Sequence, residues 1–362
     1  MALPFKIGVL QLSMEPVRET IAMAKACEDA GFDTFWIAEA YPWWRKHSFE
    51  ARSSTAILAV IAHETRRIDL GWGIISPYTR HPVQIAMEAR VMQDLAGDRF
   101  LLGLGASKIF MKEVGEGEGE KVGPATVMRE SLEIIKGVLQ GEAFHYEGKV
   151  FRADVPLLKA DAHSPHGMPR TYIAGTGPVL QKMAGSISDG LLTASITTPE
   201  FVKYSRKNME EGARKVGRDP ARIELGSVIV GSIDRDPAKG REGAREQAAM
   251  YLANKVQNIR GSADVLLQCA QLTFDELQPI ADAMEKGGRK AAAKAVTDGI
   301  LRKVHPIAGT PQECIAALEE YRAAGCNHIM LEIWGENRTE QAKLFGETVL
   351  PHFHRAAGTT HS

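Results

Sequence analysis

The sequence of 362 residues is poor in cysteine, nearly balanced in charge and free of long hydrophobic runs. Its four cysteines, Cys27, Cys269, Cys314 and Cys326, show no metal-binding spacing, which favours reduced thiols in a cytoplasm. The formal net charge of −1 gives no reason to expect nucleic acid or an anionic membrane as a partner. No segment approaches the roughly 18 apolar residues of a membrane span, and the N-terminus lacks the features of a signal peptide. We therefore expect a cytoplasmic protein that acts on a small molecule.

The sequence also lacks the usual signatures of several catalytic classes. It has no serine–histidine–acid pattern and no cluster of histidine and carboxylate residues that predicts a metal site. Two histidine pairs, His163 with His166 and His352 with His354, lie in a loop and near the C-terminus and are not expected to bind metal. No glycine fingerprint opens the first predicted helix, which argues against a dinucleotide-binding open sheet.

Short apolar segments alternate with amphipathic helical segments along most of the chain. Eight of them are predicted to be strands, at residues 6–11, 34–39, 69–75, 100–105, 170–175, 190–195, 223–233 and 328–334. Strand–helix alternation predicts parallel pairing, and eight units favour a closed α/β barrel over a doubly wound open sheet. The Ala-rich region at about 236–304 is predicted to be a helical insertion after the seventh strand, with breaks at Gly261 and Gly287–Gly288. We expect a single domain over residues 1–362, with a small hairpin at 144–151.

Glycine-rich turns follow two of the predicted strands. In barrels of this kind the active site lies at the carboxyl ends of the strands. The turn "LGLGASK" follows the fourth strand, and "AGTGPV" follows the fifth. Glycines between a strand and a helix expose backbone N–H groups that can hold a phosphate, and Pro178 suits the first turn of the next helix. A site built from backbone, glycine and hydroxyl groups favours a bulky cofactor that brings its own reactivity.

The third predicted strand lies in "DLGWGIISPYTRHP", Asp69 to Pro82, and contains Gly71 and Gly73. Glycine inside a strand usually marks a bulge, or a place where a ligand or another backbone comes close. We therefore expect an irregular strand at this position.

Four segments carry a family likeness: "GIISPYTRHP", "DLAGDRFLLGLGASK", "YIAGTGPVLQKMAGSISDGLLTAS" and "AGTPQECIAALEEYRAAGCNHIML". They resemble the bacterial-luciferase-like superfamily and, within it, the deazaflavin (F420) branch, with the closest likeness to methylenetetrahydromethanopterin reductases. The likeness runs from about Lys6 to about Trp334. It implies an eight-stranded (β/α)8 TIM barrel with insertions, the fold that the strand count also predicts.

The resemblance implies roles for individual residues. The implied cofactor-binding residues are Gly73, Ile74, Ser76, Gly105, Ala106, Ser107, Gly175, Thr176 and Gly177. The last three are expected to hold the phosphate. A non-prolyl cis peptide bond is implied at Gly73–Ile74, with a trans β-bulge as the alternative. Glu39 is the candidate catalytic residue for proton handling, or else a salt-bridged carboxylate, and Arg80 is a candidate contact for a phosphate or glutamyl tail.

The sequence also departs from the family pattern. Leu10 stands where the archaeal reductases have an acid, and Lys108 stands where related sugar-phosphate dehydrogenases have a glutamate. Trp43 and Trp44 are expected either to roof the coenzyme or to pack in the core. Fold and coenzyme therefore carry over better than substrate.

The implied activity is F420-dependent hydride transfer to or from an organic substrate. The first alternative is an FMN-dependent monooxygenase of the same fold, and the second is a non-catalytic ligand-binding barrel. The family also implies a homodimer or a higher homo-oligomer.

Overall fold

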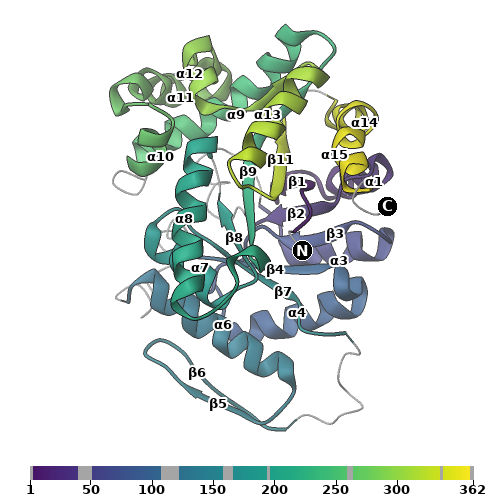
Figure 1. Cartoon of the computed structure of the whole chain (residues 1–362), viewed down its shortest axis with the longest axis vertical. Coiled ribbons are helices and arrows are strands. Elements are labelled where there is room, and N and C mark those ends of the chain that lie inside the picture. The colour runs from purple at the N-terminus through teal and green to yellow at the C-terminus, as the bar shows by residue number, and fades with distance from the viewer. Residues whose placement is uncertain are drawn as a thin grey trace.

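The computed structural model describes residues 3–39, 51–106, 122–157, 166–193, 196–258, 264–334 and 337–358. Its centre is a barrel of parallel strands, in which β9 pairs with both β8 and β11 and so closes the sheet (Figure 1). The strands, in barrel order, are β1 (Lys6–Leu12), β2 (Thr34–Ala38), β3 (Asp69–Trp72), β4 (Phe100–Gly105), β7 (Arg170–Ala174), β8 (Gly190–Thr193), β9 (Glu224–Ile233) and β11 (His328–Ile333). The predicted eight-stranded barrel is confirmed, and the open sheet is excluded.

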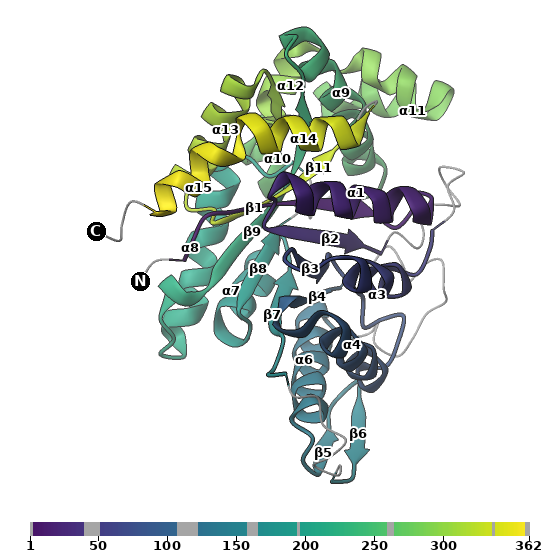
Figure 2. The ribbon, with the colours of Figure 1, turned by 90° about the vertical axis from the view of Figure 1, so that its right-hand side faces the viewer.

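Helices that follow the strands form an outer ring, in which α1 lies beside α14 (Figure 2). These helices are α1 (Val17–Ala30), α3 (Ser54–Glu64), α4 (Pro82–Ala96), α6 (Pro124–Gln140), α7 (Pro178–Ile187), α8 (Pro199–Lys215), α13 (Pro311–Ala323) and α14 (Arg338–Thr348). Several begin with proline, whose fixed φ and missing N–H suit the first helical turn. A further helix, α15 (Leu350–Gly358), packs its Phe353 ring against Phe5, with 5.2 Å between the ring centroids.

Two additions extend the barrel. After β9 come α9 (Pro237–Asn258), α10 (Asp264–Cys269), α11 (Phe274–Ala295) and α12 (Asp298–Val304), which lie together at the top of Figure 1. Helix α11 is broken at Gly288, where φ is 69°. A short strand that was not predicted, β10 (Ile307–Gly309), then pairs with the end of β9 in the same sheet. The second addition is a hairpin formed by β5 (Phe144–Glu147) and β6 (Arg152–Val155). Its first strand was predicted, but its second strand begins beyond residue 151, where the predicted hairpin ends.

The glycines of the third strand make room for side chains of the neighbouring strands. A Cβ at Gly71 would stand 2.1 Å from the ring of Trp36, and one at Gly73 would stand 2.8 Å from Leu10 Cδ1. Both side chains belong to the cluster that fills the barrel: Leu10, Trp36, Leu101, Tyr172, Leu192, Val228 and Met330. These glycines are therefore required, at least in part, by packing inside the barrel.

The predicted irregularity of the third strand is present, but the predicted cis bond is wrong. β3 ends at Trp72, and pairing with β4 resumes at the bridge between Ile75 and Leu104. None of the peptide bonds in the described residues is cis, so Gly73–Ile74 is trans. The trans form is favoured by about 2.5–4 kcal/mol for a non-proline residue. Gly73 has no side chain, so the chain passes Leu10 with a trans bond and without a steric clash.

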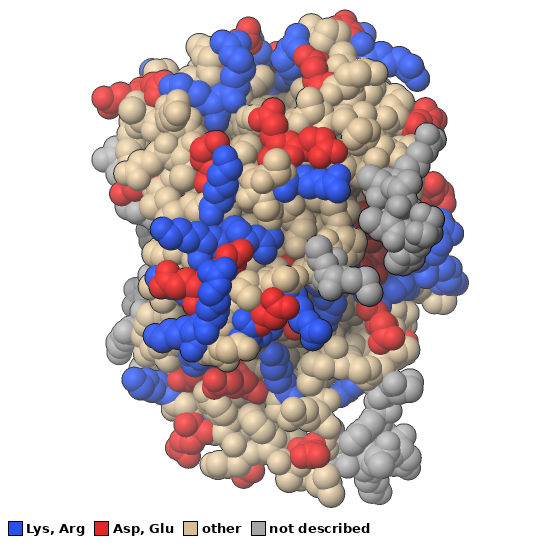
Figure 3. Space-filling view, viewed as in Figure 1, with Lys and Arg blue, Asp and Glu red and all other residues tan. Residues whose placement is uncertain are grey.

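The surface carries both signs of charge, and Figure 3 shows basic and acidic side chains interspersed over the face that it displays. Within the described ranges, no helix has the length and apolar character needed to cross a membrane. All four cysteines are free, and three of them are buried. These observations agree with the composition.

Candidate functional site

The structure brings most of the predicted site residues together at the carboxyl ends of β2, β3, β4 and β7. The backbone N–H of Glu39 donates to the carbonyl of Ile74 at 3.3 Å, which joins the end of β2 to the bulge. A Cβ at Gly105 would lie 2.7 Å from the Ile74 side chain, and Ser76 Oγ donates to the carbonyl of Ala106 at 3.1 Å. We call this end of the barrel the rim.

An apolar shelf, formed by Leu12, Ala38, Ile74 and Ala174, covers the barrel interior at the rim. All four side chains are partly exposed and pack on the interior cluster below them. Leu12, Ala38 and Ala174 end β1, β2 and β7, and Ile74 lies in the bulge after β3, so several neighbouring strands contribute to the shelf. A partly exposed apolar surface with a few polar groups at its edge is typical of sites for flat, bulky ligands.

The Gly175–Gly177 turn connects β7 to α7 and leaves the start of α7 open. Gly177 is the N-cap, no side chain caps the first turn, and a Cβ at Gly177 would meet nothing within 4 Å. Because the first backbone N–H groups of a helix lack partners within the helix, this turn can accept an anion. The turn is held from behind by Gln181, a buried residue that sequence reasoning missed. Its Nε2 donates to the carbonyl of Thr176 at 3.2 Å and to Ser205 Oγ at 2.9 Å.

Glu39, the candidate catalytic acid, is already ion-paired. Arg80 Nη2 donates to both carboxylate oxygens of Glu39, at 2.8 and 3.0 Å, and Arg80 Nη1 donates to Glu88 at 3.1 Å. Arg80 therefore bridges two glutamates, and its guanidinium lies against Glu39 at the edge of the shelf. Any proton exchange at Glu39 would therefore take place next to the positive charge of Arg80.

A second acid, Glu332, lies at the rim on β11. Its side chain is buried and accepts hydrogen bonds from Gln247 and Tyr251 of α9, and from Trp334 Nε1 at 3.2 Å. Burial raises the pKa of Glu332 to about 7, although the three hydrogen bonds oppose the shift. The sequence placed Glu332 at a strand end, but nothing in it linked that residue to a helix some 80 positions away.

The opposite, amino end of the barrel is densely ion-paired. Glu224 of β9 accepts from Arg170 at 2.8 Å, from the Tyr172 hydroxyl at 3.2 Å and from the ring of His328. Burial alone would raise the pKa of Glu224, but His328, together with Lys6 and Arg170, lowers it far below its ordinary value.

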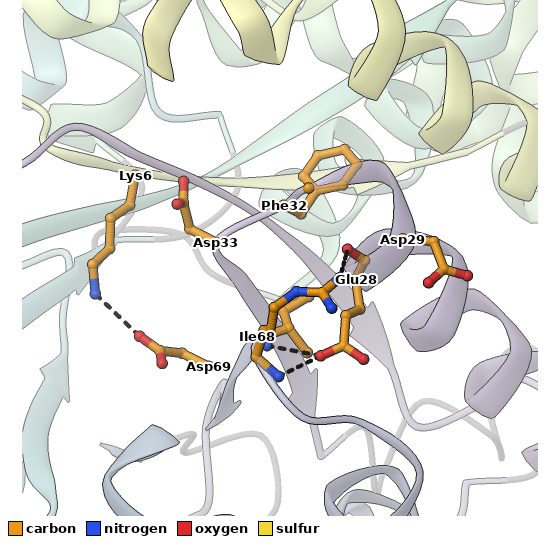
Figure 4. A pocket seen from close by; sticks show the side chains of 9 residues that line it. Lys6, Glu28, Asp29, Phe32, Asp33, Ile68 and Asp69 are labelled. Atoms are coloured by element: carbon orange, nitrogen blue, oxygen red, sulfur yellow. Dashed lines mark hydrogen bonds and ion pairs between the residues drawn. The ribbon is translucent and has the colours of Figure 1, made fainter. Parts of the chain in front are cut away.

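A pocket lies near this end, lined by the starts of β1, β2 and β3 and the end of α1 (Figure 4). Its polar groups are engaged in structural contacts. Lys6 pairs with Asp69 at 3.2 Å, and Glu28 Oε1 accepts from the backbone N–H groups of Arg66, Arg67 and Ile68. In αβ barrels the amino face serves stability, so we place the functional site at the rim.

Some expectations fall on residues outside the described ranges, namely Ser107, Lys108, Trp43, Trp44 and His163. In the described part of the chain, no group of three or more His, Cys, Asp or Glu side chains could hold a metal ion.

Comparisons with known proteins agree with this geometry. The chain is 30% identical over 345 residues to the 5,10-methylenetetrahydromethanopterin reductase of Methanopyrus kandleri, covering 91% of this chain and 93% of that protein. It is 26% identical to the F420-dependent glucose-6-phosphate dehydrogenase of Mycolicibacterium gilvum, covering 93% of this chain and 94% of that one. The solved coenzyme F420-dependent tetrahydromethanopterin reductase of Methanopyrus kandleri superposes with a TM-score of 0.85 at 28% identity, covering 97% of this chain and 100% of that one. The model of the luciferase-like monooxygenase family matches residues 1–328, and the chain belongs to this family.

Proposed function

We propose that the protein is an F420-dependent oxidoreductase that transfers a hydride between the reduced deazaflavin and an organic substrate, in the manner of a methylenetetrahydromethanopterin reductase. The apolar shelf next to an open helix N-terminus is the observation that carries the proposal, because it offers a surface for a flat ring and an anion site for a phosphate. The relatives named for F420, which match over nearly the whole chain, support the choice of coenzyme.

The residues at the rim fit such a coenzyme. The shelf would support the ring, with Gly73, Ile74, Gly105 and Ala106 beside it and Ser76 bracing Ala106 from behind. The Gly175–Gly177 turn would hold the phosphate on backbone N–H groups. The open space at Gly177 is what close approach of a phosphate requires.

The chemistry divides between coenzyme and protein. A bound reduced deazaflavin supplies the hydride. The protein presents one face of the ring, fixes the distance to the substrate and keeps water out of the barrel mouth. Glu39 is our candidate for exchanging a proton with the substrate, and Arg80 holds its carboxylate in place.

Titration with two coenzymes tests the proposal. F420 and flavin mononucleotide are added separately to the protein in the same buffer, and tryptophan fluorescence reports binding. We expect F420 to bind at least ten times more tightly. Tighter binding of flavin mononucleotide, together with oxygen-dependent turnover, would establish the monooxygenase alternative. Binding of a ligand without turnover of any added acceptor would favour the non-catalytic barrel.

We also propose that the protein pairs as a homodimer through α4. Met87, Val91 and Leu95 recur every fourth residue on this helix and are 64%, 51% and 41% exposed. Val60 of the adjoining α3 is 44% exposed. An apolar stripe on the outer side of a surface helix is unusual in a monomer, and a twofold axis would place it against itself in a second copy.

Sedimentation velocity tests the dimer. The double variant Met87→Asp, Val91→Asp should sediment as a monomer where the unchanged protein sediments as a dimer. Equal masses for the two proteins would contradict this surface.

We infer that the helices at 236–304 belong to the same domain as the barrel, since Val230 and Ile196 pack in one cluster with α9 and α11. The four free cysteines support the expected cytoplasmic location.

A further inference from the structure

Glu332 faces the interior of the barrel at the rim. Alternate residues of a strand point to the same side, and on β11 Glu332 shares its side with His328 and Met330. Met330 belongs to the interior cluster, and the ring of His328 lies 5.6 Å from that of Trp36, which does too. The side chain of Glu332 is therefore directed into the mouth of the barrel, where it is 2% exposed.

The two partners of Glu332 on α9 can serve either protonation state of its carboxyl group. A tyrosine hydroxyl donates to a carboxylate and accepts from a carboxylic acid. A glutamine amide does the same after a half turn, which exchanges its NH2 group and its oxygen. Gln247 Oε1 is buried without a hydrogen-bond partner in the described structure, so an acceptor is available to a protonated Glu332. A proton can thus enter or leave this site without breaking up the network.

The surroundings of Glu332 hold little charge. Among the described residues, no cation is a cause of its pKa shift, and its neighbour in register on β9 is Val230. Arg289 of α11 and Arg338 of α14 lie over the ring of Trp334, at 4.8 and 5.9 Å from its centroid.

Two titratable groups lie on the α9 side of Glu332. Tyr251 is hydrogen-bonded to it, and burial raises the pKa of this tyrosine well above its ordinary value. Lys255 is one turn further along α9, where burial lowers its pKa to about 8. The pKa of Glu332, near 7, is therefore set mainly by burial and can respond to events at the rim.

A purely structural role explains these features less well. A glutamine at position 332 could make the same contacts with α9 without the cost of burying a charge. An acid that persists in such a place, with a pKa close to neutral, is typical of a group that exchanges protons.

We propose that Glu332 stores the proton that is released when hydride transfer takes place at the rim, and that Tyr251 passes this proton to it. The inference rests on the proposed function. A bound reduced deazaflavin would supply the hydride, whose two electrons reduce the acceptor, and would release one proton at the ring. Tyr251 takes up this proton as its own hydroxyl proton moves to the carboxylate of Glu332. The proton then leaves to solvent by the same route, which restores the carboxylate.

The protonation state of Glu332 can be measured in the protein without coenzyme or substrate. Infrared difference spectra between pH 5 and pH 9 should contain a carboxylic-acid C=O band with a midpoint near pH 7, and Glu332→Gln should lose it. The matched control is Glu246→Gln, which changes an acid on α9 that lies 3.8 Å from Arg289, and this variant should keep the band. In Tyr251→Phe the midpoint should move to higher pH, because the carboxylate loses a donor that stabilises it. Absence of a carboxylic-acid band that titrates between pH 5 and pH 9 would overturn the proposal.

Kinetics then test the transfer itself. Glu332→Gln should slow turnover about 100-fold, the lower end of the usual contribution of a positioned acid or base. It should also remove the kinetic step near pH 7 while leaving the Kd of F420 within about twofold. Unchanged turnover with an unchanged pH profile would overturn the proposal.

If Glu332→Gln does not fold, Tyr251→Phe tests the same proposal. This variant keeps the acid, and the step in its pH profile of turnover should move to higher pH. Failure of F420 to bind the unchanged protein would refute the proposed function and the relay with it. The infrared midpoint would still decide whether Glu332 holds a proton.

Discussion

Two buried glutamates, Glu224 and Glu332, lie on adjacent strands inside one barrel and differ in almost every electrostatic respect. Glu224, at the amino end, is 1% exposed and contacts Arg170 and His328, and its pKa is lowered. Glu332, at the rim, is 2% exposed and contacts neutral donors, and its pKa is raised. Burial is the same in both, so the partners decide the direction of the shift.

The contrast indicates that the two ends of the barrel have different roles. At the amino end, Glu224 has fixed, charged partners, so its protonation would break a network that joins β7, β9 and β11. At the rim, the acid has partners that accept either state, and small and apolar residues leave room for a ligand. The predictions that follow test this division, beginning with the largest expected effect.

Replacing Glu224 with glutamine should be the most damaging change. Arg170 would remain partly buried without its counter-charge, and removing one member of a buried ion pair typically costs about 3–5 kcal/mol of the free energy of unfolding. Urea denaturation at pH 7 measures the loss. A loss below about 1 kcal/mol would mean that the amino end is not the stabilising face that we describe.

Glu332→Gln should have the opposite sign and depend on pH. The folded protein holds the Glu332 proton up to about pH 7, whereas the unfolded chain loses it near the ordinary pKa of 4.5. The free energy of unfolding therefore falls between these values as pH rises, by about 3 kcal/mol for a shift of this size. The variant lacks this loss and should be more stable than the unchanged protein above pH 7, with little difference near pH 4.

Glu224, with a lowered pKa, should act in the other direction. Its contribution is complete above pH 4.5 and is lost as the pH falls below that value. Thermal unfolding of the unchanged protein and of the Glu332→Gln variant from pH 3 to pH 9 separates the two effects. If the unfolding temperatures of the two proteins change with pH in parallel, the pKa assigned to Glu332 is wrong.

Two glycines of one turn should distinguish binding from folding. Gly177→Val should leave stability unchanged, because a Cβ there meets no atom, but should weaken F420 binding about 10- to 100-fold through lost phosphate contacts. In contrast, Gly175→Val should destabilise the protein, because its Cβ would stand 2.5 Å from Leu180 Cβ. Calorimetry with and without coenzyme measures both quantities. Normal affinity in a folded Gly177→Val protein would move the phosphate elsewhere.

The smallest effect is expected at an exposed ion pair near the amino end. Lys25 and Glu64 lie 3.0 Å apart, and both side chains are well exposed. Solvent screens such pairs, so Glu64→Ala should leave the urea midpoint within experimental scatter. A large change in the urea midpoint would show that proximity to the amino end, rather than burial, controls how much stability an ion pair contributes.

Local patterns in the sequence predicted most of the fold. Strand–helix alternation is a short-range signal, and it identified the barrel. The misses have physical reasons. β10 has three residues, too few for a pattern. The glycines that suggested a cis bond at Gly73–Ile74 make room for Leu10 and Trp36 instead, and the bond is trans.

The site was only partly predictable. Glycine turns and strand ends are visible in a sequence, so the rim residues from Glu39 to Gly177 could be listed. The contacts of Gln181 and of Glu332 depend on side chains that meet after folding, as when Tyr251 reaches Glu332 across 81 positions. Helical periodicity places Gln247 and Tyr251 on one face, but it does not say what that face meets.

The packing of Phe353 on Phe5 brings the two ends of the described chain together at the base of the barrel, and Asp33, just before β2, lies 3.5 Å from His354. Both ends therefore emerge on the side away from the rim, as Figure 2 shows. A tether attached to either end would hold the molecule at the amino end of the barrel, with the rim facing away from the tether. Fusion to a second enzyme or immobilisation on a support should thus leave access to the rim intact whichever terminus is chosen.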